Sequence, residues 1–151
     1  MKMVATVFRV ATSADVPAME ACRVGDTDAG EADWRMAAYL DGRHHPGQAR
    51  APRIGFIAVG DQRVIGYIAG HLTRRYRCDG EVQYLYVAPA HRRSGVGRAL
   101  VRKLADWFLP QGAKKVCVNA ADDSAAEFYR RIGAVDLKPH WLAWDDIQSI
   151  R

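Results

Sequence analysis

The sequence predicts one mixed α/β domain, and two observations lead to this expectation: the chain length and the order of the hydrophobic patterns. With 151 residues the chain can bury the core of a single domain. Strand-like and helix-like patterns follow one another as β-α-α-β-β-β-α-β-α-β-β, without a repeat or a low-complexity linker. Interleaving of this kind is typical of a mixed α/β fold. We therefore expect residues 1–151 to form one domain.

The chain begins with a strand and two short helices. Residues 6–11 alternate polar and apolar side chains, which predicts a half-buried strand. Ser13 is a suitable N-cap for a helix that runs through Met19 and Cys22. After a glycine-containing break, residues 31–40 carry an imperfect apolar face and predict a second short helix.

Three strands are expected in the middle of the chain. A loop rich in Gly, Pro, His and Arg covers residues 41–53. Residues 54–59 and 64–72 have the composition of two strands joined by the turn at 60–63. The next strand covers residues 81–87, and a proline soon after it stops the strand.

A long amphipathic helix follows a basic turn that contains two glycines. Its apolar side chains recur at helical spacing, while charged side chains fall elsewhere on its surface. Pro110 and Gly112 close the helix. The apolar positions are Val96, Ala99, Leu100, Leu104, Trp107 and Phe108.

The last part of the chain is expected to complete the sheet. Residues 114–120 predict a strand and residues 122–132 a helix. Residues 135–137 and 140–144 can then form a closing pair of strands.

The turn before the long helix has the composition of an anion-binding site. Gly95 and Gly97 let the backbone approach a ligand closely. Free backbone N–H groups of the turn and of the helix start can surround an anion. Arg92, Arg93 and Arg98 add guanidinium groups that suit phosphate oxygens. The alternative is a tight turn with solvated arginines, because neither a P-loop nor a complete dinucleotide fingerprint is present.

The residues around this turn resemble a known family. Arg92-x-x-Gly95-x-Gly97, preceded by Leu85-Tyr86-Val87-x-Pro89, resembles the acyl-CoA-binding motif of the GNAT superfamily of N-acetyltransferases. In that family the motif follows a strand and opens a helix, as it does here.

A second block is similar to a later helix of the same family. The stretch 122–134 resembles the pattern Asn-x-x-Ala-x-x-Phe-Tyr-x-x-x-Gly-Phe, with Tyr129 at the tyrosine position. Asp122 replaces the usual Asn and Ala134 replaces the usual Phe. Ser124 is therefore expected to make the cofactor contact that the Asn makes in relatives.

The resemblance implies a fold and a place for the cofactor. The expected fold is a seven-stranded, mostly antiparallel mixed sheet flanked by about four helices and splayed between its fourth and fifth strands, here residues 81–87 and 114–120. Acetyl-CoA would lie in the split, with the backbone N–H of Leu85 on its carbonyl, which requires a splay or a bulge there. The implied cofactor-binding residues are Leu85, Tyr86, Val87, Arg92, Arg93, Ser94, Gly95, Val96, Gly97, Arg98, Ser124 and Tyr129.

The same resemblance suggests two catalytic residues. Glu81 matches the position of a catalytic glutamate in some members, and it would accept the amine proton directly or through water. The alternative is a solvated carboxylate at a strand end. Tyr129 would protonate the leaving thiolate, although a buried core tyrosine is the ordinary alternative. Gln83, His71 and His140 are weaker candidates for the base.

Composition limits the other partners. The chain carries 22 basic and 17 acidic residues, a net charge of +5. Nucleic acid is not favoured, because no basic tail or binding motif accompanies this charge and a polyphosphate cofactor also explains it. Cys22, Cys78 and Cys117 lack metal-site spacing and are expected to be reduced thiols of a cytoplasmic protein. No membrane span and no metal site are expected, and His44-His45 is interpreted as solvated loop.

The sequence thus predicts an acetyl-CoA-dependent N-acetyltransferase that moves the acetyl group directly to a primary amine of a small molecule or a protein. The alternative is a non-catalytic acyl-CoA-binding or regulatory module with the same fold. The acceptor amine and a homodimeric state are left open, because residues 13–53 and 135–145, which shape the acceptor site in this family, carry no motif.

Overall fold

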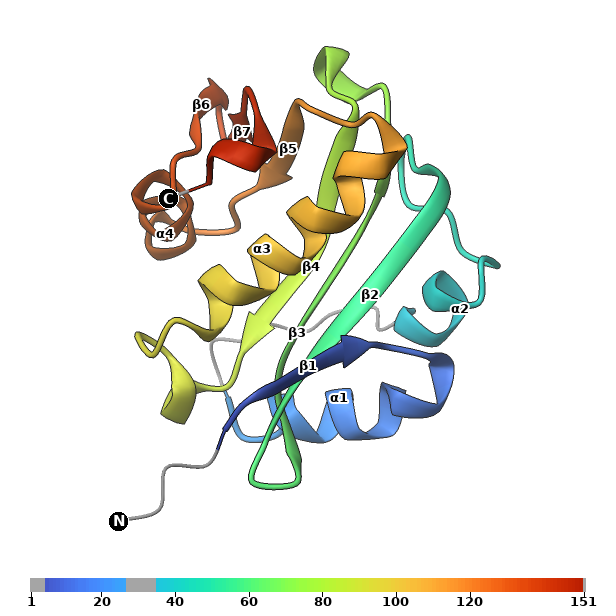
Figure 1. The fold of residues 1–151 in the computed structure, drawn as a ribbon, viewed down its shortest axis with the longest axis vertical. Helices are drawn as coiled ribbons and strands as arrows, with labels where there is room; N and C mark the ends of the chain where they lie inside the picture. Colours follow the sequence, from blue (N-terminus) through green and yellow to red (C-terminus); the bar gives the residue numbers. More distant parts are fainter. Residues whose placement is uncertain (1–4, 27–34, 151) are drawn as a thin grey trace.

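The computed structural model describes residues 5–26 and 35–150, which form one seven-stranded sheet with helices on both faces (Figure 1). The strand order is β1-β2-β3-β4-β5-β7-β6, and the pair β4–β5 is parallel while the other neighbouring pairs are antiparallel. The strands are β1 (Val7–Val10), β2 (Arg50–Gly60), β3 (Arg63–Leu72), β4 (Gly80–Val87), β5 (Val116–Asn119), β6 (Val135–Lys138) and β7 (Trp141–Trp144). The described helices are α1 (Val16–Arg23), α2 (Met36–Leu40), α3 (Val96–Phe108) and α4 (Asp123–Arg131).

Each face of β2 and β3 has its own hydrophobic core. Ala58 and Ile68 face α3, in a cluster that continues to β5, β7 and α4. Ile57 and Tyr67, one position earlier on each strand, face α1 and α2. This alternation is the expected consequence of the two-residue period of a strand. The long helix α3 therefore covers one face of the sheet, while α1 and α2 cover the other (Figure 1).

The sheet splays between β4 and β5, as the family resemblance implied. Residues 80–82 of β4 pair with residues 116–118 of β5, and the pairing stops there. β4 nevertheless continues to Val87, still paired with β3 on its other side. The last residues of β4 therefore present an edge to β5 without a ladder between the two strands.

A bulge at Gln83 lies at the point where the splay begins. Ala69 pairs with Tyr84, but the next residue of β3, Gly70, pairs with Val82, so Gln83 is left over. Because a bulge shifts the alternation by one residue, Glu81 and Tyr84 lie on the same face of β4 although they are three positions apart, and Tyr84 packs on the α2 side.

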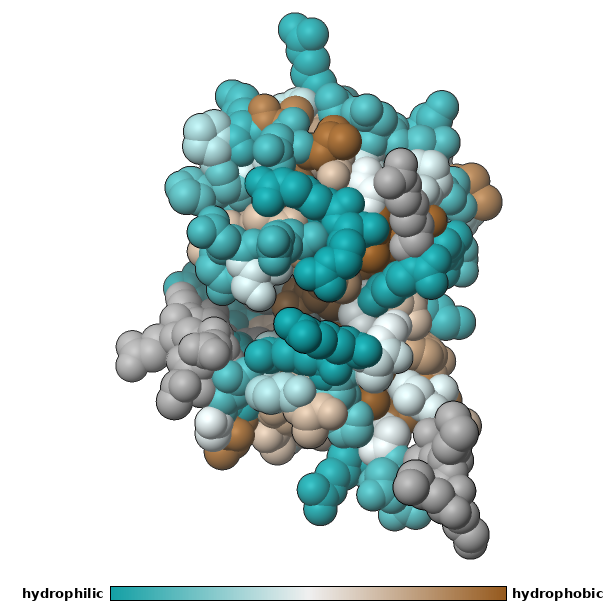
Figure 2. All heavy atoms as spheres, turned by 90° about the vertical axis from the view of Figure 1, so that its left-hand side faces the viewer, coloured by the Kyte–Doolittle hydropathy of each residue, from teal (hydrophilic) through white to brown (hydrophobic). Residues whose placement is uncertain are grey.

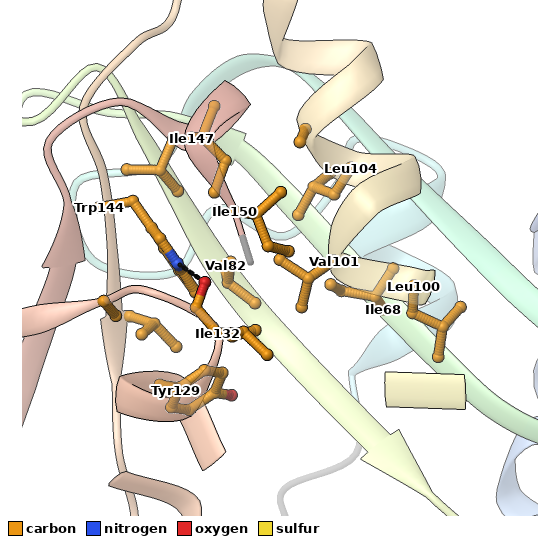
Figure 3. Packing of buried hydrophobic residues seen from close by; sticks show 14 of the residues in the cluster. Ile68, Val82, Leu100, Val101, Leu104, Tyr129, Ile132, Trp144, Ile147 and Ile150 are labelled. Atoms are coloured by element: carbon orange, nitrogen blue, oxygen red, sulfur yellow. Dashed lines mark hydrogen bonds between the residues drawn. The ribbon is translucent and has the colours of Figure 1, made fainter. Parts of the chain in front are cut away.

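The second half of the sheet is held together by α4 and the C-terminal segment. Trp144 on β7 is buried, and its indole Nε1 donates to the Ile132 carbonyl at 3.3 Å (Figure 3). Ile147 and Ile150 then pack toward Val101 of α3 (Figure 3). These contacts connect the β5–β7–β6 half of the molecule to the long helix.

Several predicted boundaries were wrong. β2 begins at Arg50 and not at residue 54, because the strand continues across Pro52 with a register shift between Arg50 and Arg53. A proline fits such an interruption since it has no N–H for the ladder. The predicted second helix is reduced to Met36–Leu40 in the described part of the chain, and residues 31–34 lie outside the described residues.

The start of the first helix also differs from the prediction. Ser13 is not its N-cap, because a 3-10 turn (Ser13–Asp15) precedes α1. Asp15 accepts the backbone N–H of Thr12 at 2.8 Å and pairs with Arg9, so its carboxylate fixes the turn. None of the described helices has the length and apolar character needed to cross a bilayer.

Candidate active site

The turn between β4 and α3 holds its backbone amides in an anion-binding arrangement. A 3-10 turn, η4 (Pro89–His91), leads into Arg93 and Gly95, which have φ of 61° and 87°. The Ala99 N–H makes the first intrahelical bond of α3, to the Gly95 carbonyl at 3.0 Å. The N–H groups of residues 96–98 precede it and belong to the first turn, where helix geometry provides no acceptor. A negatively charged group is therefore favoured at this end of α3.

The side chain of Arg92 fastens this turn to the rest of the molecule. Its Nε donates to the Val87 carbonyl at 2.9 Å, and its Nη2 pairs with Asp26 at 2.8 Å. The Tyr86 hydroxyl donates to the same Asp26 carboxylate at 2.6 Å. Arg92 is thus committed to protein contacts, while Arg93 is exposed at the turn.

The exposed edge of β4 directs two residues toward the split. The Ala88 N–H donates to the Ile65 carbonyl of β3 at 2.8 Å. Because backbone groups alternate in direction along a strand, the N–H groups of Val87 and Leu85 point the other way, toward β5. The Tyr86 side chain packs on the α1 side and stacks on Tyr67, so only its backbone lies along this edge.

A hollow lies on the side of the molecule where β4 and β5 separate. Figure 2 faces the side of the molecule on which β4 and β5 separate, and it shows a depression with a hydrophobic floor between hydrophilic side chains. Leu85 and Val87 are partly buried against the main core cluster and belong to β4 beyond its pairing with β5. The arrangement fits an extended ligand with an apolar arm and an anionic end.

Tyr129 lies on α4 with its ring packed edge-on against Trp144, at a centroid distance of 5.8 Å. The side chain is 6% exposed, and among the described residues its hydroxyl has no hydrogen-bond partner. In Figure 3 the hydroxyl oxygen is turned away from Trp144, toward the side of β4. Burial raises the pKa of this hydroxyl, so it stays protonated and can act as a donor.

The start of α4 uses Asp122 in a structural role. Its carboxylate accepts the Ala125 N–H at 2.8 Å, which caps the helix. Ser124, expected to replace the cofactor contact of the family's Asn, is exposed in the first turn of α4. Asp122 therefore stabilises the start of α4 as its N-cap.

Glu81 is buried, not solvated, with 4% of its surface exposed. Its Oε1 accepts the Arg75 Nε–H at 2.9 Å. Burial raises the pKa of Glu81, while Arg75 opposes this shift. A carboxylate whose pKa is moved toward neutral pH can take a proton from an amine.

His71 adjoins Glu81 and Tyr39 adjoins His71; sequence reasoning ranked His71 low and missed Tyr39. The His71 Nε2 lies 3.9 Å from Glu81 Oε1, and the His71 Nδ1 lies 2.8 Å from the Tyr39 hydroxyl. His71 shares a face of β3 with Tyr67 and Ala69, at the spacing i, i+2, i+4, so alternation could have predicted its burial. Nothing in the sequence placed Tyr39 of α2 beside it.

The remaining candidates lie apart from this group. Gln83 is half-buried at the bulge, and His140 is exposed in the turn between β6 and β7. Burial raises the pKa of the Cys22 thiol to about 11 and that of the buried Cys117 upward as well, so neither is a ready nucleophile. Among the described residues, no three His, Cys, Asp or Glu side chains come together as a metal site.

A mixed sheet that splays between two parallel strands, with a glycine-containing helix start at the mouth of the split, is the arrangement found in acetyltransferases of the GNAT fold. The chain belongs to the acetyltransferase (GNAT) family, whose family model matches residues 19–134.

Solved structures of the same fold cover nearly the whole chain. An acetyltransferase from Thermus thermophilus superimposes with a TM-score of 0.73 at 15% identity, covering 95% of this chain and 98% of that one. The Escherichia coli GNAT family N-acetyltransferase YhbS, solved in complex with CoA, gives 0.70 at 22% identity, covering 95% and 83%. The ribosomal-protein-S18-alanine N-acetyltransferase of E. coli gives 0.69 at 14% identity, covering 93% of each chain.

A curated relative matches only a segment. The acetyl transferase GW6a of Oryza sativa subsp. japonica is 34% identical over 55 residues, which make up 36% of this chain. The match spans 13% of the length of the rice protein.

Proposed function

We propose that this protein is an acetyl-CoA-dependent N-acetyltransferase that moves the acetyl group directly to an amine. The observation that carries the proposal is the β4 edge beyond residue 82, which is free of β5 and runs toward the amides at the start of α3. This combination offers a polar backbone edge, an apolar floor and an anion site in one line, which fits the pantetheine arm and the pyrophosphate of CoA.

The residues of the split would bind and polarise the donor. The amides of residues 96–98 at the start of α3 would hold the pyrophosphate, and the backbone N–H groups of Leu85 and Val87 would bind the pantetheine arm and the acetyl carbonyl. A donor aimed at the carbonyl oxygen stabilises the charge that develops there during attack. The Val87 carbonyl is already an acceptor for Arg92, so its N–H is the group left for the ligand.

Proton transfer would be divided between two side chains. The amine nitrogen forms a bond to the acetyl carbon while the carbon–sulfur bond breaks. Glu81 takes the amine proton, directly or through one water, because its pKa is raised by burial. The Tyr129 hydroxyl gives its proton to the departing thiolate and regains one from solvent. The thiol groups of the chain take no part in this scheme.

An amine panel with acetyl-CoA, followed by thiol release and by the mass of the product, tests the proposal. The panel should include amino acids, polyamines, aminoglycosides and peptides with free N-termini. We expect transfer to at least one class, and kcat about 10²–10⁴-fold lower for Glu81→Gln. Tyr129→Phe should lower kcat and leave the KM for acetyl-CoA in place.

The same assay distinguishes the proposed enzyme from the alternative, a non-catalytic acyl-CoA-binding module. Acetyl-CoA binding without transfer to any amine would favour a regulatory acyl-CoA-binding module. A protein that fails to bind CoA would contradict both functions. Wild-type turnover in Tyr129→Phe would remove Tyr129 from the mechanism and leave the rest of the proposal standing.

A further inference from the structure

A line of three buried side chains runs from α2 through β3 to β4. The Tyr39 hydroxyl lies 2.8 Å from His71 Nδ1, and His71 Nε2 lies 3.9 Å from Glu81 Oε1. Tyr39 and His71 are fully buried and Glu81 is 4% exposed. Bulk water therefore does not compete for these contacts, and the three side chains determine each other's hydrogen bonding.

The second ring nitrogen of His71 faces the Glu81 carboxylate. Among the described residues, His71 Nε2 is a buried nitrogen without a hydrogen bond. An unsatisfied buried polar atom costs free energy, so a nearby acceptor matters. The 3.9 Å gap is too long for a direct hydrogen bond, but a small movement of the Glu81 carboxylate closes it.

Burial, together with two nearby arginines, keeps the His71 ring neutral near pH 7. Arg53 of β2 and Arg75, in the 3-10 turn η3 (Arg75–Arg77), are the cations that act on it, and Tyr39 and Glu81 are its other ionisable neighbours. Burial and these two arginines lower the pKa of His71 to about 4. The His71–Glu81 contact is therefore not an ion pair near neutral pH, and it depends on which nitrogen carries the single proton.

Tyr39 decides which nitrogen that is. If the Tyr39 O–H donates to Nδ1, the ring proton resides on Nε2 and points at the Glu81 carboxylate. The opposite tautomer would direct an Nε2 lone pair at a negative charge, which is repulsive. The first tautomer is the one that suits an ionised Glu81.

We propose that Tyr39 and His71 are positioning residues that hold the Glu81 carboxylate in its ionised form and in one orientation. This inference rests on the proposed role of Glu81 as the base. Oε1 is then fixed by the Arg75 Nε–H and oriented by the His71 Nε2–H, and Oε2 remains for the amine proton. An orienting third group behind a base is a general feature of activated catalytic pairs.

Two substitutions of His71 separate this role from simple packing. His71→Gln places an amide nitrogen near the position of Nε2 and keeps a donor toward Glu81. His71→Asn places its amide near Nδ1, so it keeps a partner for Tyr39 but cannot reach Glu81. We expect His71→Gln to retain most of kcat and His71→Asn to lose roughly tenfold, a part of the roughly 10²–10⁴-fold contribution of a general base.

Tyr39→Phe tests the tautomer without touching Glu81. Without the hydroxyl, the Nε2–H tautomer loses the hydrogen bond that favours it, so the donor toward the ionised carboxylate is held less firmly. The pKa of Glu81 then rises, so the acid limb of kcat/KM should shift to higher pH by roughly 0.5–1 unit. Tyr67→Phe removes another buried hydroxyl from the same core cluster and should leave the limb in place.

The outcomes are distinct. Two results would overturn the positioning role while leaving Glu81 as the base. One is an equal loss of kcat in His71→Gln and His71→Asn that parallels their loss of Tm. The other is an unshifted acid limb in Tyr39→Phe. If Glu81→Gln keeps wild-type kcat, the proposed base itself is wrong, and the His71 and Tyr39 variants should then be active with an unchanged pH profile.

Discussion

The two glycines of the turn are required for different physical reasons. Gly95 has φ of 87°, and a Cβ placed there would meet no atom within 4 Å, so conformation alone selects glycine. Gly97 lies inside the first turn of α3, where a Cβ would come within 3.1 Å of the Phe128 ring of α4. The sequence predicted the need for glycine but not this contact between two helices.

This difference predicts that Gly95→Ala mainly lowers stability, whereas Gly97→Ala mainly lowers kcat. The first variant should lose about 1–2 kcal/mol of unfolding free energy, because its left-handed backbone disfavours a side chain. The second should displace Phe128 and its neighbour Tyr129, lowering kcat more than its stability loss explains. Urea unfolding and steady-state kinetics measure the two effects. If the two variants lose the same unfolding free energy and the same kcat, the contact between position 97 and Phe128 does not affect catalysis.

At the scale of elements, the sequence predicted strands and helices well where the pattern is local. The amphipathic α3 is confirmed. The split between β4 and β5, which the family resemblance implied and no local pattern showed, is confirmed as well. The bulge at Gln83 was not predicted, because it depends on the register with β3. For the same reason the sequence leaves open whether Glu81 is a surface carboxylate or a site residue. Its neighbours Arg75 and His71 lie on two other elements, and Tyr39, which contacts His71, lies on a third.

Hydrogen exchange of the β4 amides tests whether the edge of β4 beyond residue 82 is unpaired. In the free protein the amides of Leu85 and Val87 should exchange faster than that of Ala88, which is bonded to Ile65. CoA should slow Leu85 and Val87 by at least roughly tenfold through new hydrogen bonds, and leave Ala88 unchanged. Slow exchange of Leu85 and Val87 without ligand would mean that this edge is already paired.

At the scale of the whole molecule, the sheet has two parts joined by a short ladder. β4 and β5 pair only over residues 80–82 and 116–118. Beyond it, Arg102 of α3 donates to the Ile150 carbonyl at 3.0 Å, and Gln148 donates to the Ala105 carbonyl at 2.6 Å. The C-terminal segment thus connects the two parts of the sheet through its hydrogen bonds to α3. The split between β4 and β5 lies away from these contacts, and a ligand in the split would contact both parts.

A ligand that bridges the two parts should stabilise the fold as a unit. At about 100 times its Kd, CoA should add about 2.7 kcal/mol to the unfolding free energy. For a chain of this size each kcal/mol raises the Tm by about 2–4 °C, so we expect a rise of roughly 5–10 °C in a thermal melt. Pantetheine lacks the pyrophosphate and cannot use the amides of residues 96–98, so it should give a smaller shift at equal concentration. A shift below one degree with saturating CoA, or an equal shift with pantetheine, would contradict the placement of the pyrophosphate at the start of α3.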